Sequence, residues 1–184
     1  MAGEKILLHI CCGPCAIYPI RSLQQQGFEV VGLYYNPNIH PLREYLRRRE
    51  AASQVAQKLG IKLICKDDEY DPGRYLREVV HREPSRCFFC YRLRLERSLS
   101  IARRGGFEWF SSTLLSSARQ KHEQIAELAS SLAGGGSPAF FYQDFRAGRK
   151  EAMEISRQWE IYRQQYCGCL YSEWERYHKE LDSG

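Results

Sequence analysis

Long apolar runs are missing from this sequence. No stretch approaches the roughly 18 residues that a membrane-spanning helix needs, and residues 1–5 lack the apolar core of a secretory signal peptide. These absences predict a cytoplasmic protein without a membrane partner. Cytosolic reductants keep thiols reduced, so we expect the eight cysteines to bind metal or carry out redox chemistry before they form disulfides.

Glycine-rich phosphate loops are missing as well. The chain has no Walker-type or dinucleotide-type motif, so nucleotide hydrolysis has no support in the sequence. It also lacks internal repeats and low-complexity segments. With 184 residues, of which 43% are hydrophobic and 27% charged, the chain suits a single domain over residues 1–184.

Acidic residues are outnumbered by basic ones, which gives a net charge of +5. Most of the positive charge is arginine, whose planar fork binds phosphate in a way that lysine does not. Arginines gather on two predicted helices, and Tyr91 accompanies those of the second. This pattern suits an RNA partner, although solvated helix faces explain it equally well.

Short apolar runs alternate with amphipathic stretches. Strands are predicted at residues 5–10, 28–35, 61–65, 107–112 and 139–142. Helices are predicted at residues 15–26, 41–59, 74–81, 86–104, around 125–132, 151–158 and 172–181. The apolar stripe of the second helix is Leu42, Tyr45, Leu46, Ala52, Val55, Ala56 and Leu59.

This alternation predicts an α/β fold, a Rossmann-like parallel sheet with helices on both faces. Ligands of such sheets bind beyond the carboxyl ends of the strands, near the point where the strand order reverses. The densest group of cysteines, Cys11, Cys12 and Cys15, directly follows the first predicted strand. We therefore expect it to lie in the ligand site.

Two further cysteine pairs, Cys87/Cys90 and Cys167/Cys169, stand far away in the chain. The hypothesis is that the fold brings all seven thiols to one metal site built from residues 9–15, 86–90 and 166–169. Only Cys65, isolated at the end of a predicted strand, fits the alternative of a buried core thiol.

Three chemistries compete for these thiols. Cys12-Gly13-Pro14-Cys15 is typical of a thioredoxin-like dithiol at a helix start, but that interpretation leaves the two distant pairs unused. A structural zinc takes four ligands and leaves three thiols over. A 4Fe-4S cluster also takes four, and the remaining three can then hold a second metal or act on substrate.

Several other side chains follow predicted strands. His9 and His40 are candidate ligands or proton donors, although a lone histidine is more often structural. Asp144 follows the fifth strand and is expected near the metal site. Asp67, Asp68 and Asp71 follow the third strand, where Asp71-Pro72 also suits a helix start.

Taken together, the motifs resemble the cobalamin-independent epoxyqueuosine reductase family, QueH. The resemblance covers about residues 5–175 and rests on six motifs in one order. These are His9-x-Cys11-Cys12-x-Pro14-Cys15, Asn36-Pro37-Asn38-Ile39-His40-Pro41, Arg86-Cys87-x-x-Cys90-Tyr91-x-x-Arg94-Leu95, Ser112-Thr113-Leu114-Leu115, Asp144-Phe145-Arg146, and Tyr162-Arg163-Gln164-x-Tyr166-Cys167-Gly168-Cys169. Cys65 and Ala118-Arg119 depart from the pattern.

The resemblance implies a fold similar to the adenine-nucleotide alpha-hydrolase group, with cysteines in place of its phosphate loop. It also implies a 4Fe-4S cluster, an additional iron ion, and reduction of the epoxide of epoxyqueuosine at the wobble position of tRNA to give queuosine. An unidentified electron donor completes the expected partners. The division of the cysteines between the cluster and the iron stays open.

Residue roles follow as hypotheses. The metal ligands are Cys11, Cys12, Cys15, Cys87, Cys90, Cys167 and Cys169, with Asp144 as a further candidate. Asp144 and His9 are the candidate catalytic residues, and Arg86, Arg94, Arg146, Arg163 and Tyr91 are expected to bind the tRNA. The competing functions are a zinc-stabilised RNA-binding module and a thioredoxin-like thiol-disulfide oxidoreductase.

Overall fold

Five strands form one parallel sheet in the computed structural model, which describes residues 3–183. They are β1 (Lys5–His9), β2 (Glu29–Tyr34), β3 (Lys62–Cys65), β4 (Trp109–Ser112) and β5 (Ala139–Phe140). Their order across the sheet is β3-β2-β1-β4-β5. Every pairing is parallel, which confirms the predicted α/β class.

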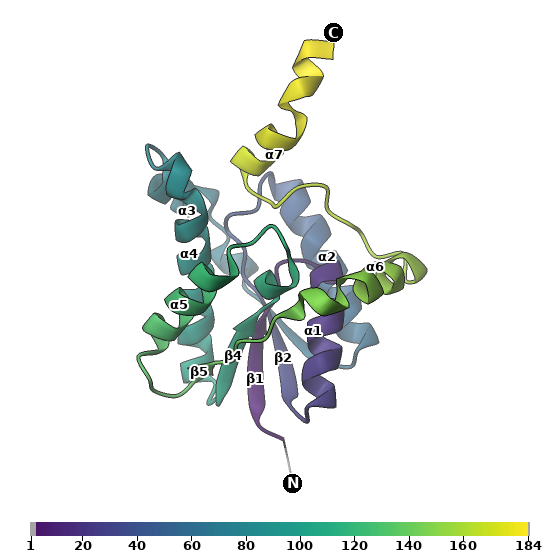
Figure 1. The fold of residues 1–184 in the computed structure, drawn as a ribbon, viewed down its shortest axis with the longest axis vertical. Coiled ribbons are helices and arrows are strands. Elements are labelled where there is room, and N and C mark those ends of the chain that lie inside the picture. Colours follow the sequence, from purple (N-terminus) through teal and green to yellow (C-terminus); the bar gives the residue numbers. More distant parts are fainter. Residues whose placement is uncertain (1–2, 184) are drawn as a thin grey trace.

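Helices cover both faces of this sheet (Figure 1). On one side lie α1 (Gly13–Gln25), α2 (Leu42–Lys58) and α6 (Arg149–Gln158). On the other lie α3 (Pro72–Val79), α4 (Arg86–Arg104) and α5 (His122–Ala133). Parallel strands require such crossovers, and the chain moves outward from β1 in both directions. The order therefore reverses between β1 and β4.

The core lies around β1, because that strand is central and covered on both faces. Ile6, Leu7 and Leu8 have no exposed surface. A continuous apolar run of this kind is what a buried parallel strand needs. The predicted inner face of α4 is confirmed as well, since Tyr91, Leu95, Leu99 and Ala102 are all buried.

The predicted stripe of α2 is wrong at its first turns. Leu42 and Leu46 are 52% and 40% exposed, whereas Glu44 and Arg48 are buried. The reason is tertiary: Arg48 binds backbone carbonyls of a segment near residue 167, so that face of the helix is covered although it is charged.

The ends of the helical elements also differ from the predictions. The first helix begins at Gly13, two residues early, because Pro14 suits a first helical turn. The last helix, α7, spans Leu170–Tyr177 and continues as a 3-10 helix, His178–Ser183. Figure 1 shows α7 projecting beyond the sheet and its covering helices. Within residues 3–183, no helix combines the length and the apolar character needed to cross a bilayer.

Candidate metal centre

The cysteine triad Cys11, Cys12 and Cys15 lies where the strand order reverses. It follows β1 and occupies the start of α1, as the sequence predicts. The neighbouring strand β4 ends beside it: the amide N of Cys11 donates to Thr113 Oγ1 (3.0 Å), and that hydroxyl donates to Cys11 Sγ (3.3 Å). Two strand ends thus fix the first thiol.

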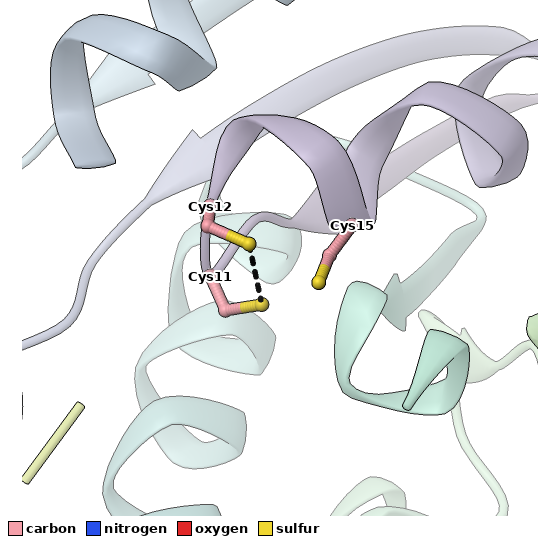
Figure 2. A group of neighbouring side chains, drawn as sticks. All are labelled: Cys11, Cys12 and Cys15. Atoms are coloured by element: carbon pink, nitrogen blue, oxygen red, sulfur yellow. Dashed lines mark hydrogen bonds between the residues drawn. The ribbon is translucent and has the colours of Figure 1, made fainter. Parts of the chain in front are cut away.

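The three sulfurs of the triad point toward one another (Figure 2). All lie within 4.8 Å of each other, and the Sγ atoms of Cys11 and Cys12 are 3.8 Å apart. Hydrogen bonds with Cys12 and Cys15 lower the pKa of Cys11 well below its ordinary value. Burial raises the pKa of Cys12, and the other two thiols raise that of Cys15. One thiolate therefore forms readily, and a cation that replaces the shared protons allows the others to form.

Four of the five remaining cysteines are considered together as the quartet, which consists of Cys87, Cys90, Cys167 and Cys169. The first two lie in the first turn of α4 and the last two directly precede α7. Burial raises the pKa of Cys87 and of Cys90, and the charges of Cys167 and Cys169 act in the same direction. Within residues 3–183, only the triad brings three or more potential ligand atoms within 4.8 Å of one another.

One pocket of about 230 Å³ has lining residues from both the triad and the quartet. Its lining includes Cys11, Cys15 and Cys167, together with the guanidinium-bearing Arg94. Arg94 is only 3% exposed, and its Nη2 donates to Cys90 Sγ at 2.9 Å. Arg94 was predicted to contact tRNA. Instead, its side chain lies on the buried face of α4 and binds the sulfur of Cys90.

A buried polar frame holds the last cysteine pair in place. Arg48, 1% exposed, donates to the carbonyls of Cys167 (2.7 Å) and Tyr166 (2.9 Å) and to Glu44 (2.6 Å). The backbone N of His40 donates to the carbonyl of Gly168 at 2.8 Å. Gly168 has a φ of +141°, which a residue with a side chain rarely adopts. Helix α2 and the loop before it therefore fix the cysteine-bearing loop.

Two glutamines direct N–H groups at the sulfurs. Gln164 Nε2 donates to Cys12 Sγ at 2.9 Å, and Gln120 Nε2 donates to Cys167 Sγ at 3.2 Å. Sequence reasoning singled out neither glutamine, and it placed Arg48 only among the arginines of the second predicted helix, as a candidate for RNA binding or a solvated face, whereas the structure buries it. For Gln164 the signal was present, because it stands inside the Tyr162-to-Cys169 motif, but Gln120 and Arg48 belong to no motif.

His9 lies beneath the triad, completely buried. Its Nδ1 contacts Ser112 Oγ (2.9 Å), and its Nε2 contacts the carbonyl of Tyr35 and Oδ1 of Asn36 (both 3.2 Å). Burial lowers its pKa to about 4. Both ring nitrogens are hydrogen-bonded, and these bonds connect the ends of β1, β2 and β4. The catalytic role of His9 stays a prediction.

Asp144 and Arg146 bind each other at the surface. Asp144 Oδ2 accepts from Arg146 Nη2 at 2.6 Å, and its Oδ1 accepts from the Arg146 backbone N at 3.0 Å. These bonds lower the pKa of Asp144 to about 2. Neither residue lines the cysteine pocket. Asp144 caps the short 3-10 helix Phe145–Gly148, an arrangement that the strand-end argument did not include.

The remaining predicted residues have varied surroundings. Arg86 forms an ion pair with Glu175 and lies over the ring of Tyr171. The hydroxyl of buried Tyr91 donates to Gln120 Oε1 at 2.8 Å. Of the predicted tRNA-binding arginines, only Arg163 is exposed and lines the pocket.

Two strand-end candidates lie away from the triad. The ring of His40 is buried against Tyr75. Asp71 caps α3 by accepting from the backbone N of Gly73 at 2.8 Å, so the helix-start interpretation of Asp71-Pro72 is confirmed.

Comparison with solved structures shows the same fold elsewhere. A predicted subunit of tRNA methyltransferase from Methanocaldococcus jannaschii superposes with a TM-score of 0.56 at 13% identity. The match covers 84% of this chain and 76% of that chain. At this identity, the likeness shows the α/β architecture alone.

Comparison with known sequences shows the family. The family model "Epoxyqueuosine reductase QueH" matches residues 6–175. Proteins of that name from Dehalococcoides mccartyi and Acinetobacter baylyi are 39% and 36% identical, over 96% and 92% of this chain and 97% and 81% of the relatives. The Thermotoga maritima relative is 33% identical, over 96% of this chain and 94% of its own length. With its triad, its distant cysteine pairs and its fold, this chain belongs to the epoxyqueuosine reductase QueH family.

Proposed function

We propose that this protein reduces the epoxide of epoxyqueuosine in tRNA to an alkene, which yields queuosine. The observation that carries the proposal is the converging cysteine triad at a pocket whose lining also includes Cys167 from the quartet. Family membership supplies the substrate, and the pocket supplies a place where metal-based electron transfer can reach it. A tRNA substrate also fits the cytoplasm, where these thiols stay reduced.

The residues present fit the implied metals. The quartet offers four thiolates, the number that a 4Fe-4S cluster takes. The triad offers three converging sulfurs, which suit an additional iron ion with an open position for substrate. We assign the cluster to the quartet and the iron to the triad. Reduction of the epoxide to an alkene and water takes two electrons and two protons. When bound, the cluster would pass the electrons one at a time from the external donor, the iron would act as a Lewis acid for the epoxide oxygen, and the protons would come from solvent.

The protein's own groups prepare this chemistry. Gln164, Gln120 and Arg94 donate hydrogen bonds to sulfur, which stabilises thiolates in a buried setting. Phe145 and Leu114 line the pocket and give it an apolar wall against which a base extruded from the anticodon loop can pack. Arg163 lies at the rim. Asp144 is ionised, so its proposed role is that of a metal ligand, and it must first separate from Arg146.

The proposal is tested by preparing the protein without oxygen. We expect about five iron and four sulfide per chain, from one 4Fe-4S cluster and one extra iron. With dithionite in place of the donor, epoxyqueuosine in tRNA should lose one oxygen in mass. Protein that holds zinc alone and is still active would overturn the metal assignment.

Cysteine variants separate the two groups. Cys15→Ser and Cys90→Ser should each abolish turnover, and Cys90→Ser should also remove most sulfide. Cys65→Ser is the control, because Cys65 lies at the end of β3 and belongs to neither group. Loss of activity in Cys12→Ser and Cys15→Ser, with full activity in Cys167→Ser and Cys169→Ser, would favour a thiol-disulfide oxidoreductase.

A further inference from the structure

Three arginines line the cysteine pocket from three separate segments. Arg119 follows the 3-10 helix Thr113–Ser116, Arg149 is the first residue of α6, and Arg163 lies in the loop before the last cysteine pair. All three side chains are exposed. Three residues that span 44 positions of the sequence thus bring their guanidinium groups to one pocket.

None of these three guanidinium groups has a carboxylate partner within the described part of the chain. Three exposed arginines outside the pocket do have carboxylate partners: Arg77 with Asp71, Arg92 with Glu96, and Arg146 with Asp144. The described residues that line the pocket include no aspartate or glutamate. The rim therefore keeps an uncompensated positive charge that is available to an anion.

The deeper lining determines which anion fits. Arg48 and Arg94 are buried and already have partners: Arg48 binds Glu44 and two loop carbonyls, and Arg94 donates to Cys90 Sγ, so neither is available to an anion at the opening. A pocket of about 230 Å³ is small for a drug-sized ligand but suits one flat base. The sugar-phosphate backbone must then remain at the rim, and guanidinium groups bind phosphate through two parallel hydrogen bonds.

We propose that Arg119, Arg149 and Arg163 form a phosphate clamp that holds the RNA backbone on both sides of the extruded nucleotide. This inference rests on the proposed function. It adds two residues to the expected interface and removes Arg94, which is buried, as well as Arg86 and Arg146, which are held in ion pairs.

The test measures the affinity for an epoxyqueuosine-containing anticodon stem-loop as a function of salt. The logarithm of the association constant falls linearly with the logarithm of the salt concentration. Each lost contact between an arginine and a phosphate of single-stranded RNA should make this slope less steep by about 0.7. The variants Arg119→Gln, Arg149→Gln and Arg163→Gln should each weaken binding roughly five-fold at 0.1 M salt, and the triple variant roughly 100-fold. The affinities of the wild type and the variants should become equal near 1 M salt, roughly where the phosphate contacts no longer contribute.

A matched control removes one charge far from the rim. Arg104 lies in the last turn of α4, roughly 20 Å along the helix from Cys90 at 1.5 Å per residue. Arg104→Gln should leave affinity and slope unchanged. Equal far-ultraviolet circular dichroism and iron content would show that the clamp variants fold.

Two results would overturn the clamp: a triple variant with wild-type affinity and slope, or an equal loss in Arg104→Gln. A failure of the proposed reductase function would give a different result from a failure of the clamp. Wild-type protein that binds the stem-loop without converting it, while the triple variant loses affinity, would contradict the reductase activity and support the clamp.

Discussion

A buried guanidinium needs partners for its donors, and Arg48 finds them in Glu44 and in two carbonyls of the cysteine-bearing loop. Removing one member of a buried pair leaves the other charged and unpaired. Arg48→Met should therefore lower the free energy of unfolding by about 3 kcal/mol, measured by chemical denaturation. Restoration of much of this loss in Glu44→Met/Arg48→Met would identify the unpaired carboxylate as the cause.

Arg49 is the matched control for Arg48. It is the next residue on α2 and also forms an ion pair, with Asp67 at 2.6 Å, but both side chains are partly exposed. Solvent screens such a pair, so Arg49→Met should cost less than about 1 kcal/mol. Equal losses in the two variants would contradict the importance given to burial.

Gln164 offers a redox prediction. Its N–H group donates to Cys12 Sγ, and hydrogen bonds to sulfur stabilise the more negative, reduced state of a bound metal. Gln164→Leu should shift the midpoint potential of the triad-bound metal by on the order of 50 mV toward negative values. Gln165→Leu, which removes only a bond to the carbonyl of Arg163, should leave the potential in place. A redox titration followed by electron paramagnetic resonance measures both.

Single residues were predictable where their spacing in the sequence indicates a chemical role, as it does for the cysteines. Spacing alone pointed to Cys11, Cys12 and Cys15, whose sulfurs the structure brings together, and the inclusion of the two distant pairs stays a prediction. Sequence reasoning did not predict the surroundings of Arg48 or of Arg149, because a hydrogen bond to a carbonyl more than 100 residues away, or an unpaired charge at a rim, has no local pattern. Arg119 appeared only as part of a departure from the family pattern.

At the scale of elements, the triad depends on how closely α1 approaches α2. A Cβ on Gly13 would lie 2.6 Å from the carbonyl oxygen of Ala51, which is too close for an undisturbed crossing. Gly13→Ala should therefore cost 1–3 kcal/mol, roughly the range for overpacking, and should reduce iron retention because the triad moves with α1. Denaturation and iron analysis measure the two effects.

Gly136 is the control for this crossing. A Cβ there would meet nothing nearer than the carbonyl oxygen of Ala133, at 3.8 Å. Gly136→Ala should keep both stability and iron. If Gly13→Ala behaves in the same way, the close approach of the helices does not position the triad.

All five strands were predicted from short apolar runs in the sequence. The clearest are β1 and β2, which are bounded by turn residues. The orientation of α2 was not predicted, because periodicity counts Leu42 and Leu46 as core and Arg48 as surface. The apolar stripe describes a helix that packs on apolar neighbours only. Here the neighbour is a polar loop, and charged residues face it.

For the whole molecule, the sheet order explains why three distant segments meet. Because β1 and β4 are neighbours at the reversal of strand order, Cys11 comes to lie beside Thr113. Helix α4 begins at the same edge and brings Cys87 and Cys90. The sequence predicted this convergence in outline. The separation into a triad and a quartet depends on side-chain positions that no spacing encodes.

We propose that iron held by these thiols drives the removal of an epoxide oxygen from tRNA. The most direct test is product formed per chain, with dithionite as reductant, in samples that carry graded amounts of iron. We predict that the conversion of epoxyqueuosine to queuosine rises in proportion to bound iron and is absent from protein loaded with zinc alone. Conversion that is independent of iron content would contradict it.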